Sequence, residues 1–278
     1  MSELKNGYTF ILSGYYGRLG NNLIQISNLI HLAKVTESLA IFKPHSLINI
    51  NKFDFRNKKN ENCHETISNK FYYKSECLGI LPNNNKKHEI FQEYIYDLLV
   101  KKKLNPFDEN TLVIHLRSGD IFMHKPNISY LQPPFSYYKF IINKFQPKKI
   151  ILVTEKDMKN PCIKKIYQEY QGKCQIQSKS LIDDIYTMLS AQVFVTSNSS
   201  LSEMLSLLSK NLKILFTFNQ QGIYSGLKYL DLGFKNYIEF KPYIDGQRGD
   251  GNWKCSPEQL KLMITHSIND IEIVDSNL

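Results

Sequence analysis

Apolar and polar positions along the chain alternate in a way that predicts strands followed by helices. Short apolar runs are typical of buried strands, and apolar residues spaced three and four apart predict helices with one buried side. An alternation of these two patterns predicts an α/β fold with doubly wound parallel sheets. The expected strands are 8–12, 111–116, 149–154, 193–198 and 212–216. The expected helices are 21–38, 88–102, about 138–145, about 181–191, and two that begin near Ser199 or Ser200 and at Ser256.

The domain organisation follows from where this alternation is interrupted. Residues 51–88 are rich in Asn and Lys and show little periodicity, so we expect them to be irregular. The parts on either side of residue 108 can each carry a sheet. We therefore expect two Rossmann-like domains, 1–108 and 109–278, that face a cleft. The last helix has a capping-box pattern from Ser256, and the sequence leaves open that it packs back on the first domain.

Composition narrows the class of protein. The five cysteines of the 278 residues are scattered without a Cys-x-x-Cys pair, which favours a reduced compartment and excludes a typical zinc site. The first residues lack a basic segment followed by an apolar one, and no apolar run approaches membrane-spanning length. We therefore expect a cytoplasmic protein, with peripheral membrane association left open. The formal net charge of +9 predicts an anionic ligand, lipid surface or nucleic acid as partner.

The first polar strand end reads "SGYYGRLGNN" and follows the apolar run 8–12. Gly17 and Gly20 would let backbone amides approach a ligand closely, and the start of the next helix favours an anion. Arg18 and Asn21 add a charge and an amide to this loop. The alternative is a tight turn with Arg18 in solvent.

The second polar strand end reads "VIHLRSGD". His115 and Arg117 are two residues apart and therefore point to the same side of a strand, with Asp120 just beyond. The planar fork of an arginine can hold two phosphate oxygens at once. The alternative is a core histidine and an arginine that pairs with Asp120.

The third polar strand end reads "VTSNSSLSEM". Ser197, Asn198, Ser199 and Ser200 supply hydroxyls, an amide and a helix N-terminus, which suit a phosphate or a ribose. The alternative is that Ser199 or Ser200 only caps the helix, with Glu203 closing a capping box.

Taken in order, these motifs resemble those of the α-1,2-fucosyltransferase family. "GRLGNN", "HLRSGD" and "DDIYTMLSAQVFVTSNSSLSEML" are similar to Gly-x-Leu-Gly-Asn-Gln, His-x-Arg-Arg-Gly-Asp, and an Asp-x-x-x-Met segment that ends in Asn-Ser-Ser/Thr-Phe-Ser. The resemblance covers about 8–34, 110–122 and 181–208. Two features depart from it: Ser118 stands where the family has a second arginine, and "LSEMLSLL" lacks the usual aromatic residues.

The resemblance implies a two-domain GT-B fold and an inverting transfer of fucose from GDP-fucose to a hydroxyl of an oligosaccharide or glycolipid acceptor. Carried over by position, Arg117 would contact the pyrophosphate and His115 would lie near the nucleotide. Arg18 and Asn21 would face donor phosphate and acceptor, and residues 197–200 would hold phosphate or sugar. No metal and no cofactor are implied, which agrees with the lack of an Asp-x-Asp pair.

Other interpretations remain. The same fold could use a different nucleotide sugar, or the chain could be a non-catalytic module for acidic glycan or nucleic acid. Nucleic-acid binding is not expected, because the lysines are diffuse rather than interleaved with aromatic residues along a groove. The general base stays open among Asp120, His115, Asp183 and Asp184. Asp183 is the weakest of these, since its capping-box spacing from Ser180 explains it.

Overall fold

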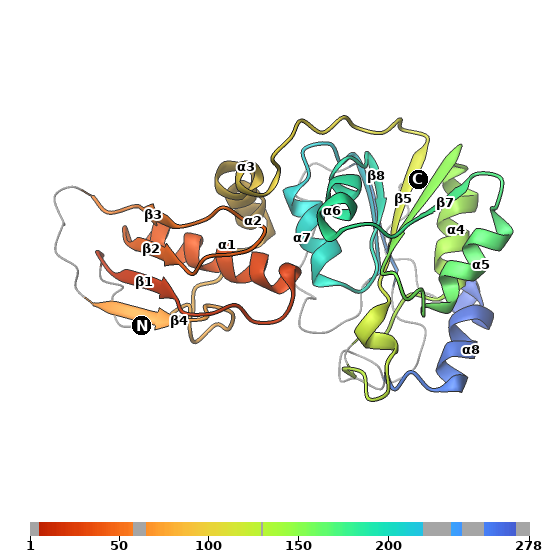
Figure 1. Ribbon diagram of the computed structural model, residues 1–278, viewed down its shortest axis with the longest axis horizontal. Helices are drawn as coiled ribbons and strands as arrows, with labels where there is room; N and C mark the ends of the chain where they lie inside the picture. Colours follow the sequence, from red (N-terminus) through yellow and green to blue (C-terminus); the bar gives the residue numbers. More distant parts are fainter. Residues whose placement is uncertain (1–5, 58–64, 129, 219–234, 241–252, 271–278) are drawn as a thin grey trace. The chain divides into compact units, whose positions relative to one another are not determined.

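The chain divides into two compact units, residues 1–103 and 104–278, which are described one by one (Figure 1). The computed structural model describes residues 6–57, 65–128, 130–218 and 253–270, and the backbone of 235–240. Both units are built from mainly parallel strands connected by helices. The predicted α/β class is therefore confirmed.

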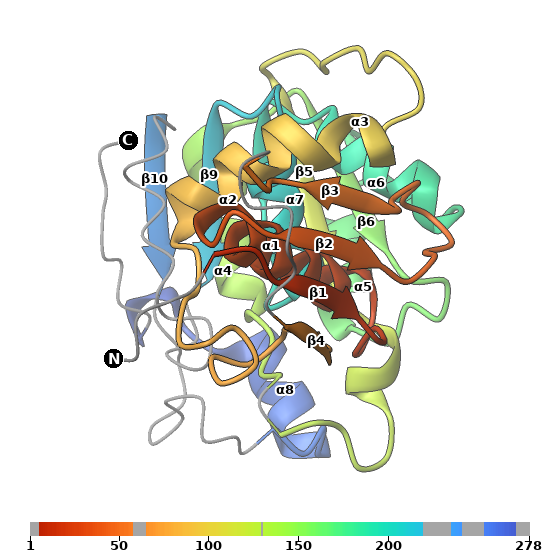
Figure 2. The ribbon, with the colours of Figure 1, turned by 90° about the vertical axis from the view of Figure 1, so that its left-hand side faces the viewer.

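The first unit contains a four-stranded sheet in the order β3-β2-β1-β4 (Figure 2). β1 (Thr9–Leu12) pairs in parallel with β2 (Leu39–Phe42) and β4 (Thr66–Asn69), whereas β3 (Lys52–Asp54) is an antiparallel edge strand. The sequence predicted an irregular segment over 51–88, and this was wrong for β3 and β4. Both strands are short and largely exposed, so they lack the apolar alternation that marks a strand.

Helix α1 (Leu19–Val35) packs against this sheet, on the face to which Phe10, Leu12 and Ala40 point. It begins two residues earlier and ends three earlier than the predicted 21–38. The predicted helix 88–102 is instead three consecutive pieces. These are α2 (Asn84–Ile90), the π-helical turn η1 (Phe91–Ile95) and α3 (Tyr96–Leu99).

The second unit contains a six-stranded parallel sheet in the order β10-β9-β8-β5-β6-β7. Its strands are β5 (Thr111–Leu116), β6 (Lys149–Thr154), β7 (Cys174–Gln177), β8 (Val193–Val195), β9 (Ile214–Phe218) and β10 (Lys235–Phe240). The predicted bounds of β5 and β6 are confirmed, but the strand predicted at 193–198 ends at Val195, and the one predicted at 212–216 is β9. The chain runs outward from β5 to β7, then returns beside β5 and runs the other way. The topological switch point of the sheet therefore lies between β5 and β8.

Helices cover both faces of this sheet (Figure 1). Leu112, Ile114 and Leu116 of β5 point into the core under α4 (Phe135–Phe145), α5 (Pro161–Glu169) and α8 (Pro257–Thr265). The opposite face carries α6 (Leu181–Leu189) and α7 (Ser200–Leu208). The capping box predicted from Ser256 is present, and α8 packs on α4 and α5 of its own unit.

Candidate functional site

A hydrogen bond bridges the switch point of the second sheet. The ring of His115, near the end of β5, has its Nδ1 atom 2.9 Å from the hydroxyl oxygen of Ser197, which follows β8. His115 is 5% exposed and Ser197 is 1% exposed. Burial hides this hydroxyl from a substrate, so the pair joins two strand ends instead of forming an exposed nucleophile and its base.

Arg117 follows at the same edge of the sheet, and its positive charge is poorly compensated. Its side chain is 7% exposed, and Nη2 lies 3.4 Å from both carboxylate oxygens of Asp120, whose side chain is 57% exposed. These distances exceed the usual 2.7–3.2 Å of an N–H···O bond. The Nε atom is buried and makes no hydrogen bond among the described residues. A buried cation in this condition favours an anionic ligand.

The Arg117–Asp120 pair is also the alternative that the sequence left open. The structure contains the pair, but with long contacts to an exposed carboxylate. Exposed ion pairs contribute about 0–1 kcal/mol, which is much less than the cost of burying an uncompensated charge. The pair alone therefore does not explain why Arg117 is buried.

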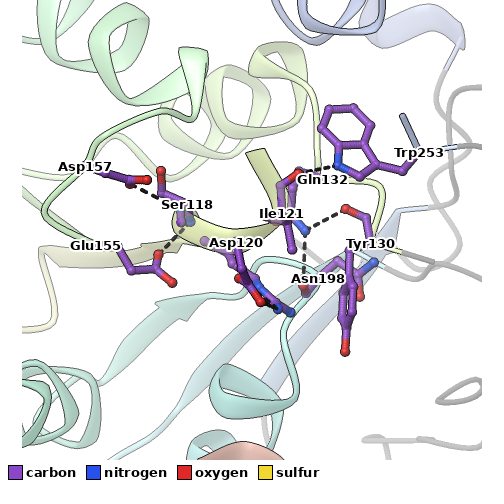
Figure 3. A network of polar contacts seen from close by, with 11 residues as sticks. Ser118, Asp120, Ile121, Tyr130, Gln132, Glu155, Asp157, Asn198 and Trp253 are labelled. Atoms are coloured by element: carbon purple, nitrogen blue, oxygen red, sulfur yellow. Dashed lines mark hydrogen bonds and ion pairs between the residues drawn. The ribbon is translucent and has the colours of Figure 1, made fainter. Parts of the chain in front are cut away.

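The backbone amides next to Arg117 are bound by carboxylates of the chain itself (Figure 3). The amide of Ser118 donates to Glu155 Oε2 at 2.6 Å, and the amide of Gly119 donates to Asp157 Oδ1 at 3.1 Å. Gly119 has φ +68°, a conformation that favours glycine. Because these two amides already have anionic acceptors, Arg117 remains as the anion-binding group of this loop.

The carboxylate of Asp157 is stabilised in its charged form by these contacts. Burial alone would raise the pKa of Asp157, but hydrogen bonds from the Ser118 hydroxyl and from the Gly119 and Lys159 amides outweigh it and lower the pKa. On the other side of the loop, Asn160 donates from Nδ2 to the carbonyl of Arg117 at 3.0 Å. The segment after β6 therefore fixes the backbone on which Arg117 sits.

The turn between β8 and α7 holds the third group of predicted residues. The amide nitrogen of Asn198 donates to the carbonyl of Leu131 at 3.0 Å, so this side chain is directed at a neighbouring loop. Ser199 is the N-cap residue of α7, but its hydroxyl makes no capping hydrogen bond, and Ser200 begins the helix. The N-terminus of α7 therefore lies at the switch point without a cap from the Ser199 hydroxyl.

The remaining predicted residues lie on the first unit, in the loop between β1 and α1. Gly17 has φ +69°, and a Cβ atom built there would lie 2.3 Å from the amide nitrogen of Asn21. The positive φ favours glycine at this position, and the Asn21 side chain packs over it. Arg18 is the exposed N-cap residue of α1, and Gly20 is buried in the first helical turn.

Gln25 of α1 holds this loop in place. Its Oε1 accepts a hydrogen bond from the Tyr16 amide at 2.7 Å, and its Nε2 donates to the carbonyls of Gly14 and Lys70 at 3.2 and 2.8 Å. The side chain is fully buried. Gln25 thus joins the ends of β1 and β4 to the helix.

The structure thus divides the predicted residues between the units. His115, Arg117, Asp120 and residues 197–200 come together at the switch point of the second unit, whereas Gly17, Arg18, Gly20 and Asn21 form the loop of the first. Asp183 and Asp184 are not part of the switch-point group. They lie in the first turn of α6 after the edge strand β7, where Ser180 caps the helix and burial raises the pKa of Asp184.

Sequence reasoning missed Tyr130, Gln132, Glu155 and Asp157. Glu155 directly follows the apolar run 149–154 and Asp157 lies two residues further on, so the search for polar residues at strand ends could have found them. Tyr130 and Gln132 lie in an irregular loop without periodicity, and no sequence signal pointed to them.

Among the described residues, no three His, Cys, Asp or Glu side chains form a group that could hold a metal ion. No helix in the same part of the chain is sufficiently long and apolar to span a membrane.

Comparisons with known proteins add distant similarities. No protein-family model matches the chain, and no curated protein does either. POFUT1 in complex with GDP is similar over 78% of this chain and 99% of its own, with 11% identity and a TM-score of 0.42. POFUT1 in complex with GDP-fucose gives 10% identity and a TM-score of 0.41 over 78% of this chain and 99% of its own. E. coli heptosyltransferase WaaC with ADP covers 92% of this chain and 98% of its own, with 10% identity and a TM-score of 0.42. At this level of similarity, the function has to be argued from the residues of the site.

Proposed function

We propose that the protein is a glycosyltransferase that binds the diphosphate of a nucleotide-sugar donor at the switch point of its second unit. One observation carries this proposal: Arg117 is buried at that point, and its ion pair within the described part of the chain is a long contact to an exposed carboxylate. A diphosphate would supply the missing negative charge, and its oxygens fit the planar fork of an arginine.

Two further features support an anionic ligand at this place. Ligands of open α/β sheets bind beyond the carboxyl ends of the strands, at the switch point. The N-terminus of α7, which carries the partial positive charge of the helix dipole, lies at the same point, and the Ser199 hydroxyl does not cap it. Both features are independent of the motif resemblance.

The proposed reaction is an inverting transfer. A hydroxyl of the acceptor attacks the anomeric carbon of the donor sugar and loses its proton to a general base, while the bond from that carbon to the diphosphate oxygen breaks. Negative charge grows on the leaving nucleoside diphosphate, and Arg117 and the α7 dipole would stabilise it. Asp120 is better placed as the base than His115, because its carboxylate is exposed while the His115 ring is buried against Ser197.

GDP-fucose is the donor that the motif resemblance favours. The measurement that tests this is calorimetric titration of the purified protein with GDP, ADP, UDP and CMP. GDP and ADP are the nucleotides found with POFUT1 and the heptosyltransferase. Tight binding of GDP alone would support a GDP-sugar, whereas preference for another nucleotide would replace fucose with a different sugar. A protein that binds none of the four would contradict the transferase proposal.

Replacing Arg117 tests the site itself. Arg117→Ala should lower the transfer rate by about 10²–10³-fold, the usual effect of removing a group that stabilises developing charge. Arg117→Lys should recover little, since an ammonium lacks the two-pronged fork. GDP titration and turnover, with circular dichroism to verify the fold, are the measurements.

The matched control is Arg56→Ala, which removes an arginine whose ion pair with Asp54 lies on the surface of the first unit. This variant should retain nucleotide binding and turnover. If Arg117→Ala also folds, binds GDP normally and turns over normally, the assignment of the site is wrong. If Arg117→Ala only unfolds, the Arg117–Asp120 pair is structural.

A further inference from the structure

The polar contacts of Arg117 are too long to fix the orientation of its guanidinium. Its guanidinium contacts Asp120 only at 3.4 Å, and its Nε atom has no hydrogen-bond partner among the described residues. A free arginine side chain samples many rotamers, so fixing it costs conformational entropy. Something else must therefore hold the guanidinium in one orientation.

Tyr130 provides this support. The central guanidinium carbon of Arg117 lies 4.0 Å from the centroid of the Tyr130 ring. A guanidinium stacked in this way is attracted by the face of the ring, while the N–H groups at its edge stay in their plane. Stacking therefore restricts the guanidinium and leaves its edge for an anion.

The loop that contains Tyr130 is held by the side-chain amides of Gln132 and Asn198 (Figure 3). The Nε2 atom of Gln132 donates to the carbonyls of Tyr130 and Asn198, each at 3.1 Å. The side-chain amide of Asn198 donates to the carbonyl of Leu131, the residue after Tyr130 in the loop, at 3.0 Å. Gln132 and Asn198 are both buried, so these bonds form in a low-dielectric environment where they are strong. The loop 130–132 is thereby joined to the turn that follows β8.

We propose that Tyr130 is a positioning residue for Arg117, and that the hydrogen bonds donated by Gln132 and Asn198 fix the backbone that carries its ring. This inference rests on the proposed function, because it assigns Tyr130 a task in binding the diphosphate. The contacts of Tyr130, Gln132 and Asn198 join three segments around the switch point: the end of β5, the loop 130–132 and the turn after β8. The predicted role of Asn198 changes accordingly, from a ligand of phosphate or sugar to a support of the loop.

The experiment compares Tyr130→Leu with Tyr130→Phe in the full-length protein. Loss of the stacked ring should weaken GDP binding by roughly 3- to 30-fold, the range expected for a cation–π contact. It should lower kcat by at least the same factor, since a misplaced Arg117 no longer meets the charge on the leaving group. Tyr130→Phe retains the ring face and should restore both values. A merely structural tyrosine would alter thermal stability without this rescue of GDP affinity.

A double-mutant comparison shows whether Tyr130 acts through Arg117. In an Arg117→Ala protein, adding Tyr130→Leu should cause no further loss of GDP affinity. The control Tyr167→Leu removes a partly exposed tyrosine of α5 and should have no effect. If Tyr130→Leu does not fold, Tyr130→Ser replaces it, since serine adds no apolar group to the loop.

The outcomes separate this inference from the proposed function. A wild-type protein that binds no nucleoside diphosphate would end both proposals. A wild-type protein that binds GDP, with equal affinity in Tyr130→Leu, would overturn the positioning role and leave the transferase proposal intact. Additive losses in the double variant would also overturn it, because Tyr130 would then act independently of Arg117.

Discussion

At the scale of single residues, two arginines at strand ends have opposite surroundings. Arg117 is buried at the switch point of the second sheet, and Arg18 is exposed at the N-cap of α1. A cation at a helix N-terminus opposes the helix dipole, so the dipole does not explain an arginine at this position. A role of Arg18 toward an anionic ligand, as the motif resemblance implies, stays our prediction.

Arg18→Ala tests that prediction. We expect transfer to fall by about tenfold or more, the usual worth of a hydrogen bond from a charged group. We expect the Tm to remain unchanged or to rise slightly, because an unfavourable charge leaves the helix N-terminus. Steady-state kinetics and a thermal melt on the same preparation are the measurements. Normal kinetics with a normal Tm would make Arg18 a solvent-exposed turn residue.

The positions of single residues could be predicted from the sequence where they follow an apolar strand. His115, Arg117 and Ser197 come together at the switch point because parallel strands bring their carboxyl ends to the same edge. Tyr130 and Gln132 could not be found in this way. Their positions depend on contacts between loops far apart in the sequence, and no local pattern records such contacts.

At the scale of elements, the loop after β1 depends on one buried side chain of the following helix. Gln25→Leu would leave the amide of Tyr16 and the carbonyls of Gly14 and Lys70 without their partner. A fully buried polar group that loses its hydrogen bond costs about 1–3 kcal/mol, and these three groups are only partly buried, so we expect a loss of stability of about this size in total. Urea denaturation followed by circular dichroism measures it. Gln168→Leu on the exposed side of α5 is the control and should stay within about 0.5 kcal/mol of wild type.

We predict that Asp157, in the segment after β6, makes the stability of the fold depend on pH. The pKa of Asp157 is lowered in the folded protein, so its contribution to stability is fully present above its unfolded pKa of about 3.9. That contribution is lost as the pH falls through the lower folded value. Asp157→Asn should therefore be less stable than wild type at pH 7, and the difference should shrink below about pH 4. Urea midpoints measured from pH 3 to pH 7 are the test; a constant difference across this range would contradict it.

Elements with strong patterns were predicted well, and weakly patterned ones were not. The bounds of β5 and β6 follow from continuous apolar runs that are buried on both faces of the sheet. β3 and β4 are short, half-exposed strands that gain stability mainly from pairing with β2 and β1. The predicted helix 88–102 contains a π-helical turn, which the spacing of apolar residues alone does not reveal.

At the scale of the whole molecule, charge and fold together favour a reaction without a metal ion. The formal net charge is +9, and the switch point supplies Arg117 and the N-terminus of α7 as positive groups. We predict that excess EDTA leaves the transfer rate unchanged and that Mg²⁺ or Mn²⁺ does not raise it. Initial rates with and without chelator are the measurement. Loss of activity on chelation, restored by manganese, would show that a metal carries the charge of the leaving group.

The buried Ser118 limits how many cations the loop after β5 can offer to a ligand. In the motif that this chain resembles, a second arginine occupies this position, whereas here Ser118 is fully buried with its backbone amide bound to Glu155. An arginine placed at 118 would displace that packing, and Glu155 and Asp157 would attract its charge away from any ligand of Arg117. Ser118→Arg alone should therefore not produce a working double-arginine motif. The two carboxylates after β6 thus set the charge capacity of this loop at one cation that is available to a ligand.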